Sequence, residues 1–270
     1  LDELLHAVRN PQLDLIARWV EKGEGDDGIA CLRGLIGYLN DEGRDRITAA
    51  GLATQLARIY SAQGRYDDAR SCLRAHAIAA TSWIRGRRAH AIALHELGSL
   101  ELYRSNLDAA ERAFRKAYRY SKFGWPIHRD EAAANLVGLA TVASDRQAFQ
   151  SVLSLTQRAG RQASAAGDYR HMIAAERLSA HALKHLGQLD EAARRIDVGL
   201  KLTELFQFDI EKASLLNVQG WLKYDSAIFH DESPAAAEES FQQSLATSQR
   251  IHSLFGLLDA KLGIAWTHLS

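Results

Sequence analysis

Apolar residues recur along the chain at the spacing of one helix face, and short polar turns interrupt them. One run has leucine at positions 94, 97, 100 and 102, and the next has Leu107, Ala110, Phe114 and Ala117. This spacing is typical of an amphipathic α-helix. We therefore expect two antiparallel helices joined by a short turn near Ser105.

The turn between these helices recurs every 41 residues. Its central position falls at Gly23, Gly64, Ser105, Arg146 and Gly187. Acidic residues follow four of the five turns at one offset, where the free N–H groups of a helix's first turn attract negative charge. Such a period leaves roughly 17 residues for each of two helices.

Small residues occur twice in each unit, twelve positions apart, and a large apolar residue follows four positions later. The small pairs are Ala57 and Ala69, Gly98 and Ala110, and Ala180 and Ala192, with Leu73, Phe114 and Ile196 as the large residues. Small side chains let two helices approach closely, and the large one fills the space between them. Because a lone pair cannot bury both of its faces, the pairs must stack.

We expect one repeat domain over residues 1–270. Its units cover about 9–46, 47–86, 87–127, 128–168, 169–208 and 209–253, with a partial unit at 254–270. Because the first residue is leucine and not methionine, we expect a piece of a longer protein.

Two units depart from the pattern. In the unit from 128, Leu139 and Ser151 stand where small residues are expected, with Leu155 as the large one. In the unit from 209, the small residues are seventeen positions apart, which predicts about five inserted residues at 229–233. Pro234 then suits the first helical position after a Ser233 cap.

Composition and motifs exclude several classes of function. The 33 basic and 33 acidic residues balance, so the basic surface of a nucleic-acid binder is not expected. No apolar run reaches the roughly 20 residues of a membrane span, and without a signal peptide we expect the cytoplasm. No phosphate loop or nucleophile elbow occurs, so we expect no enzyme and no cofactor in this chain.

The cysteines and histidines offer weak candidates for chemistry. Cys31 and Cys72 are 41 apart, so they should occupy equal places on neighbouring helices, too far apart for a disulfide. We expect two free, buried thiols. His181 and His185 share a helix face, but two polar residues without a metal are the favoured interpretation.

The unit pattern resembles the tetratricopeptide repeat (TPR) family. The resemblance lies in Leu97-Gly98, in Asn106-Leu107-Asp108-Ala109-Ala110 and in Gly187-Gln188-Leu189-Asp190-Glu191-Ala192. It implies an all-α, right-handed superhelix (a solenoid) of about six antiparallel helix pairs. The usual period is 34 residues, and the longer one looks like the variant arrays in sensor regions of bacterial signal-transduction (STAND-type) ATPases.

In such an array the first helices of the pairs line a concave groove that binds partners. We define the groove positions as three before, one after and four after each first small residue. They hold Thr54, Arg58 and Ser61; His95, Ser99 and Leu102; Leu136, Ala140 and Ala143; Arg177, His181 and Lys184; and Asn217, Trp221 and Tyr224.

The last two units make the groove basic and then aromatic. Arg177 and Lys184 beside Trp221 would suit an anionic partner, with Arg177 making paired hydrogen bonds. Alternatively, Trp221 belongs to the core between repeats, and the two cations are solvated. The carboxylate clamp of chaperone-binding TPR domains is disfavoured, because Arg58 stands where it needs asparagine.

A second candidate is the aromatic and basic stretch at residues 118–126, Tyr-Arg-Tyr-Ser-Lys-Phe-Gly-Trp-Pro. It is either an exposed edge for a partner or a set of aromatic side chains that fill the gap between units.

The leading hypothesis is a regulatory sensor domain of a larger signalling protein that binds a protein or peptide in the groove. A constitutive assembly scaffold and a sensor of small molecules or peptides remain alternatives.

Overall fold

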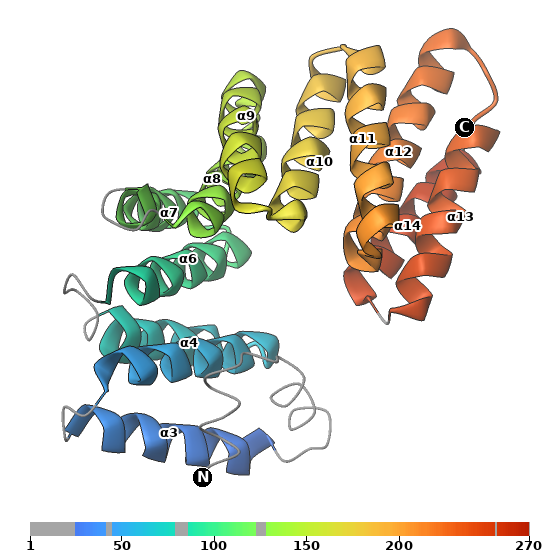
Figure 1. Cartoon of the computed structure of the whole chain (residues 1–270). Helices are drawn as coiled ribbons and strands as arrows, with labels where there is room; N and C mark the ends of the chain where they lie inside the picture. Colours follow the sequence, from blue (N-terminus) through green and yellow to red (C-terminus); the bar gives the residue numbers. More distant parts are fainter. Residues whose placement is uncertain (1–24, 42–44, 79–85, 123–127, 252, 270) are drawn as a thin grey trace. The chain divides into compact units, whose positions relative to one another are not determined.

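The structure is a computed structural model that describes residues 25–41, 45–78, 86–122, 128–251 and 253–269 (Figure 1). These residues form twelve α-helices and one π-helical segment, and no strand occurs among them. The all-α class and the stacking of helix pairs are confirmed. The chain divides into two compact units, residues 1–138 and 139–270.

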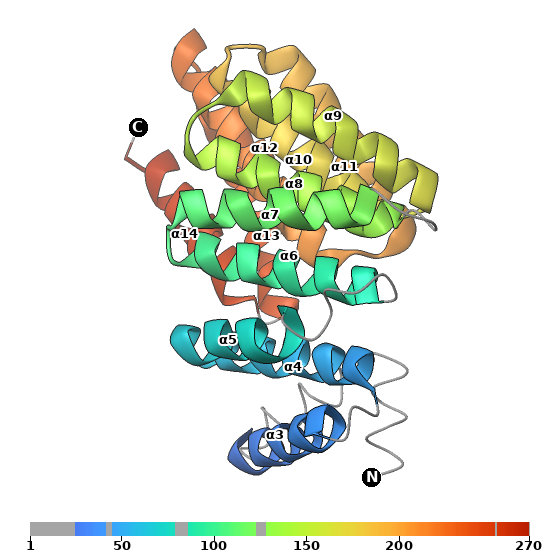
Figure 2. The same cartoon turned by 90° about the vertical axis from the view of Figure 1, so that its left-hand side faces the viewer.

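The described residues of the first unit form five α-helices, the π-helical segment and the start of a further helix (Figure 2). Its elements are α3 (Gly25–Asp41), α4 (Arg46–Ala62), α5 (Tyr66–Cys72), the π-helix η1 (Leu73–Ile78), α6 (Arg87–Tyr103), α7 (Leu107–Lys122) and the first part of α8 (Arg129–Asp145). Helices α6 and α7 form an antiparallel pair, and α4 packs against α3, α5 and α6.

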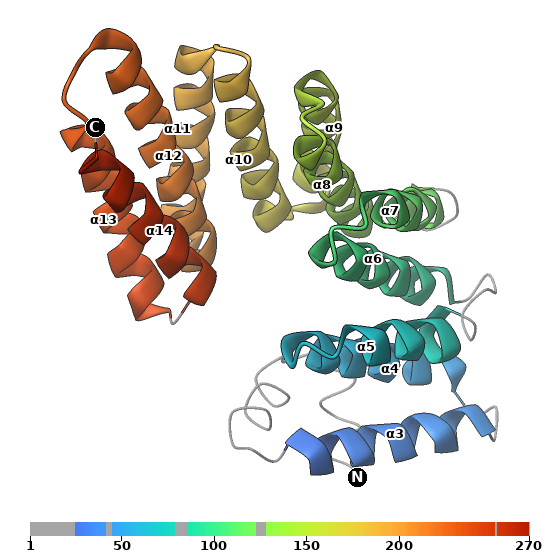
Figure 3. The same ribbon diagram turned by 180° about the vertical axis from the view of Figure 1, so that it is seen from behind.

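The second unit is also built from packed helices (Figure 3). Its helices are the rest of α8, α9 (Phe149–Ala166), α10 (Tyr169–His185), α11 (Leu189–Phe206), α12 (Asp209–His230), α13 (Ala235–Arg250) and α14 (Leu254–Thr267). Helices α10, α12 and α14 follow one another in a layer, and α11 and α13 pack beside them.

The turns inside the pairs depend on residues with positive φ. Gly64 (φ 74°), Ser105 (φ 56°) and Gly187 (φ 73°) adopt this conformation at three predicted turn positions. At the fourth, the residue is Gln147 (φ 58°) and not Arg146, so this turn comes one residue late. Gly23 lies outside the described residues.

The late turn corrects the expectation for the repeat that contains α8 and α9. Ser151, expected as a small packing residue, is exposed, and Leu155 is only partly buried. Val152 and Thr156, one residue further on, are the buried ones. Leu139 is also buried. A single added residue turns a helix by about 100°, so the whole buried face moves by one position.

The expected insertion at 229–233 was placed correctly only in part. Helix α12 extends to His230, so most of the extra residues lengthen a helix of 22 residues, and Asp231 (φ 56°) ends it. The prediction that Ser233 caps the next helix is wrong. Pro234 itself occupies the N-cap position of α13, and no side chain caps this helix.

The large apolar residues fill the space between helices as the sequence indicated. Leu73, Phe114 and Ile196 are each 1% exposed. Phe114 on α7 lies against two glycines on neighbouring helices, Gly98 on α6 and Gly138 on α8. Phe241 on α13 repeats this arrangement in the second unit, against Gly220 on α12 and Gly263 on α14.

Polar contacts also join successive pairs. Glu101, 2% exposed, accepts hydrogen bonds from Arg70 at 2.7 Å and from Asn106 at 3.1 Å. Arg88 on α6 pairs with Asp130 on α8 at 2.8 Å. Cys72 is a free, buried thiol, as expected. The side chain of Cys31 on α3 lies outside the described residues.

The close approach at Phe114 predicts the effect of a single methyl group. A Cβ on Gly98 would lie 2.7 Å from the Phe114 ring, so Gly98→Ala should lower the free energy of unfolding by about 1–3 kcal/mol. Gly51→Ala is the control, because its Cβ would meet nothing within 4 Å on the exposed face of α4. That change should raise stability by about 0.5–1 kcal/mol. Urea denaturation measures both, and equal effects would contradict the packing role of Gly98.

Candidate functional site

In the first unit, the predicted groove residues mainly connect neighbouring repeats. Arg58 on α4 pairs with Glu96 on α6 at 2.5 Å. His95 Nδ1 lies 3.1 Å from the Asn135 side-chain oxygen on α8, and the His95 ring lies 5.3 Å from the Phe114 ring. Ser99 is partly exposed beside them. The polar groups in this part of the predicted groove are therefore mostly engaged by other residues of the chain.

Thr54 was also expected in the groove, but it is 4% exposed and its hydroxyl donates to the Ala50 carbonyl. The prediction that Leu136 and Ala140 line the groove is wrong, because both residues are completely buried. The extra residue before Gln147 explains this error. It moves the equivalent positions by one, to Val137, Thr141 and Ser144.

In the second unit, α10 brings three predicted residues onto one face. Lys184 Nζ lies 2.6 Å from Asp225 on α12, so this cation joins two helices instead of being free for a ligand. Arg177 forms no ion pair with any residue that the structure describes. Burial lowers the pKa of the Arg177 guanidinium, and the negative charge of Asp259 on α14 opposes this effect. Arg177 is thus a partly exposed cation that burial disfavours in its charged form, with an acid in its surroundings.

His181 lies at the centre of this face. Its Nδ1 is 3.3 Å from the Ser144 hydroxyl, and its Nε2 is 3.3 Å from His185 Nε2. The Phe149 ring stacks on His185 at 4.6 Å, with 5° between the planes. Burial, and then the charges around it, lower the pKa of His181 to about 4. His181 is therefore neutral at pH 7.

The aromatic end of the face lies on α12. The partly exposed Trp221 ring packs edge-on against Phe241 at 5.2 Å and against Tyr224 at 5.9 Å. Asn217 is 5% exposed, and its side-chain oxygen is buried without a hydrogen-bond partner. One edge of Trp221 belongs to the core and the rest of the ring remains accessible, so its binding role stays a prediction.

We call the set Arg177, His181, Asn217, Trp221 and Tyr224 the inner face of the second unit. Arg177 and Asn217 occupy the ninth position of α10 and α12, and His181 and Trp221 the thirteenth. Because α10 packs on α12 and α12 on α14, equal positions on these helices face the same side. Ser144 and Asp225 were missed from the sequence, and a one-residue correction of the register would have found Ser144.

The second candidate stretch borders a basic hollow. A cavity of about 320 Å³ is lined by Arg87, Lys116, Arg119 and Tyr120. The Tyr120 ring lies 4.4 Å from the buried His90 ring. The remainder of the stretch, from Phe123 to Pro126, lies outside the described residues.

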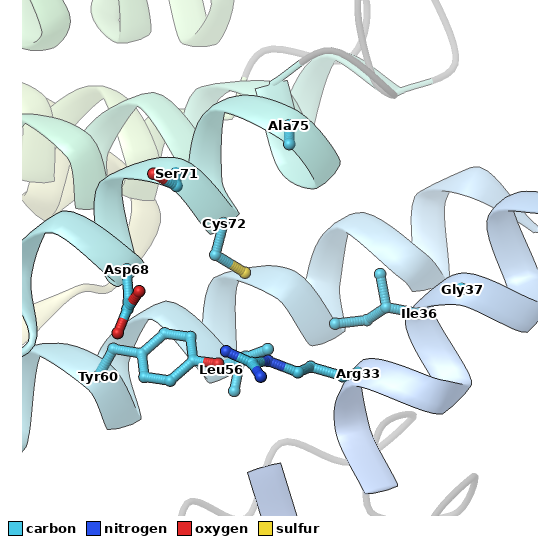
Figure 4. A pocket seen from close by; sticks show the side chains of 9 residues that line it. All are labelled: Arg33, Ile36, Gly37, Leu56, Tyr60, Asp68, Ser71, Cys72 and Ala75. Atoms are coloured by element: carbon cyan, nitrogen blue, oxygen red, sulfur yellow. The ribbon is translucent and has the colours of Figure 1, made fainter. Parts of the chain in front are cut away.

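A further cavity was not anticipated from the sequence. It has a volume of about 390 Å³ and lies between α3, α4 and the helix formed by α5 and η1 (Figure 4). Its lining consists of Arg33, Ile36, Gly37, Leu56, Tyr60, Asp68, Ser71, Cys72 and Ala75. These residues come from three helices and two repeats, so no local motif reveals them.

Two kinds of feature are absent from the described residues. They contain no group of three or more histidine, cysteine, aspartate or glutamate residues that could hold a metal ion. None of the helices in this part of the chain is long and apolar enough to cross a membrane.

The helix pairs and their small-residue contacts agree with a comparison against known families. Residues 48–122 match the tetratricopeptide repeat family. This segment covers α4 to α7, where the Gly98 and Phe114 contact lies. No curated protein matches the chain.

The solved structures that are similar to the chain include the following two. Aspartyl phosphate phosphatase F from Bacillus subtilis gives a TM-score of 0.65 at 13% identity, over 85% of this chain and 59% of that one. YrrB, a TPR protein with an unusual peptide-binding site, gives a TM-score of 0.46 at 18% identity, over 83% of this chain and 95% of that one. The first likeness shows a shared fold, and the chain spans less than two thirds of that protein's length.

The lowered pKa of His181 predicts a pH dependence of stability. An unfolded histidine binds its proton near pH 6.5, whereas His181 in the folded chain does so only near pH 4. The free energy of unfolding should therefore fall as the pH decreases from 6.5 to 4. For a half-buried ring the loss between pH 7 and pH 5 should be about 1 kcal/mol, after allowing for screening by solvent.

His181→Gln should reduce this loss, because glutamine does not titrate and can still bond to Ser144. His230→Gln is the control, since His230 is exposed at the end of α12. Urea denaturation at the two pH values measures the effect. An equal loss of unfolding free energy in the wild type and in His181→Gln would show that His181 does not cause this pH dependence.

Proposed function

We propose that this chain is a non-catalytic binding domain that holds a protein or peptide segment on the inner face of the second unit. The observation that carries the proposal is a partly exposed Arg177, without an ion pair among the described residues, on the same face as the partly exposed Trp221. Helical-repeat arrays use their extended faces for binding.

The chemistry of the face indicates what the segment carries. A carboxylate that reached Arg177 could accept two parallel N–H bonds, which are strong where water is excluded. The Trp221 and Tyr224 rings offer flat apolar surface to a neighbouring apolar side chain. We therefore expect an acidic residue next to an apolar or aromatic one.

We further propose a regulatory role, as the sensor region of a larger signalling protein in the cytoplasm. The free Cys72 thiol agrees with a reducing compartment. The long repeat period supports the sensor role through its resemblance to STAND-type arrays. Binding would shift the equilibrium between two states of the whole protein, and so change a neighbouring effector domain, only by the difference in partner affinity between those states. A constitutive scaffold would bind in the same place without such a difference.

A peptide display library selected against the whole chain tests the binding role. We expect enriched peptides with an acidic residue beside an apolar one, and at least a tenfold weaker affinity, about 1.4 kcal/mol, for Arg177→Gln and for Trp221→Ala. Fluorescence anisotropy with a labelled peptide measures both.

Leu205→Ala is the matched control, because Leu205 is 72% exposed on α11, outside the inner face. Trp221 also contacts Phe241, so Arg177→Gln separates loss of binding from loss of folding. Enriched peptides that bind both variants with the affinity of the wild type would overturn the proposal. The absence of any enrichment would also overturn it.

A further inference from the structure

The cavity between α3, α4 and α5 has an apolar floor and a charged rim. Ile36, Leu56, Tyr60 and Cys72 on its floor are buried, whereas Arg33, Asp68 and Ser71 at its rim are exposed. Its volume of about 390 Å³ lies within the range of small-ligand pockets. All of the lining residues belong to the first unit, so this site is independent of the inner face of the second unit.

The Tyr60 hydroxyl is the unusual feature of this cavity. Tyr60 is 2% exposed, and its hydroxyl is buried without a hydrogen-bond partner. An unsatisfied buried hydroxyl destabilises a fold, so such groups are rare and call for an explanation. Phenylalanine would fill the same volume without this cost. The hydroxyl therefore lacks a partner among the described residues, and an outside group could supply one when the side chains that cover it move aside.

Arg33 supplies a positive charge next to this hydroxyl. Its guanidinium lies over the Tyr60 ring, 5.5 Å from the ring centre, and the two polar groups point toward each other (Figure 4). No acid among the described residues pairs with Arg33. Asp68 at the same rim is already bound by Arg65 at 2.7 Å. The rim therefore has one cation whose charge remains unneutralised.

The wall of the cavity is built by an irregular helix. Helix α5 ends at Cys72 and continues as the π-helix η1, which carries Ala75. π-Helical turns are rare, and they occur frequently at functional sites. Burial raises the pKa of the Cys72 thiol to about 11. The thiol donates to the Ala53 carbonyl at 3.4 Å, so Cys72 is a neutral part of the wall and not a nucleophile.

We propose that this cavity binds a monocarboxylate with an apolar body. The carboxylate accepts hydrogen bonds from the Tyr60 hydroxyl and from the Arg33 guanidinium, which must first swing away from the ring. The apolar body lies against Ile36, Leu56 and Ala75. A free organic acid and the last residue of a peptide present the same chemistry, so either can be the source.

Isothermal titration calorimetry on the whole chain tests this site with defined probes. We expect 4-phenylbutyrate or the peptide acetyl-Gly-Gly-Phe with a free carboxylate to bind. The matched amides, 4-phenylbutanamide and acetyl-Gly-Gly-Phe-amide, should bind at least tenfold more weakly. The acid that binds more tightly identifies the source. Failure of both acids to bind at millimolar concentration would overturn the proposal.

Two variants separate binding from folding. Tyr60→Phe removes only the unpartnered hydroxyl, so it should weaken acid binding about tenfold while the urea midpoint stays equal or rises. Arg33→Gln should weaken binding by a similar factor. Arg74→Gln is the control, because Arg74 is an exposed arginine on η1 that does not line the cavity. Unchanged binding in both Tyr60→Phe and Arg33→Gln would also overturn the proposal.

Discussion

The contact of an aromatic ring with the bare backbone of two glycines determines how neighbouring helix pairs fit together. Phe114 lies between Gly98 and Gly138, and a Cβ on either glycine would come within 2.7 Å of the ring. Close-packed interiors have no room for such an atom, so the ring fixes the separation of three helices at once. Phe241 does the same for α12, α13 and α14. The accessible faces depend on these contacts, since His95 touches Phe114 and Trp221 touches Phe241.

The two units use equivalent positions differently. In the first unit, Arg58 and His95 are engaged by Glu96 and Asn135, so their polar groups hold successive repeats together. In the second unit, Lys184 has this connecting role, whereas Arg177 is left without an acid at bonding distance among the described residues. A charge that is desolvated but not paired costs free energy, which a bound carboxylate would recover. This contrast is why we propose binding at the second unit.

Most of the helical architecture could be predicted because its cause is local. Glycines with positive φ, acidic first turns and apolar spacing act over a few residues, and the 41-residue interval repeats them. The prediction failed where one residue was added before Gln147, which moved the buried positions from Ser151 and Leu155 to Val152 and Thr156. The partners of the groove residues could not be predicted, because Glu96, Asp225 and Ser144 reach them from other helices.

The linear pattern was enough to predict that the chain is helical and that Leu73, Phe114 and Ile196 are buried. These properties follow from the period and volume of the side chains, which a linear pattern carries. Which polar groups stay unsatisfied, such as the Tyr60 hydroxyl and the Asn217 oxygen, became apparent from the folded chain alone. Hydrogen bonding and desolvation depend on distances between groups that are far apart along the chain, so the order of residues alone does not determine them.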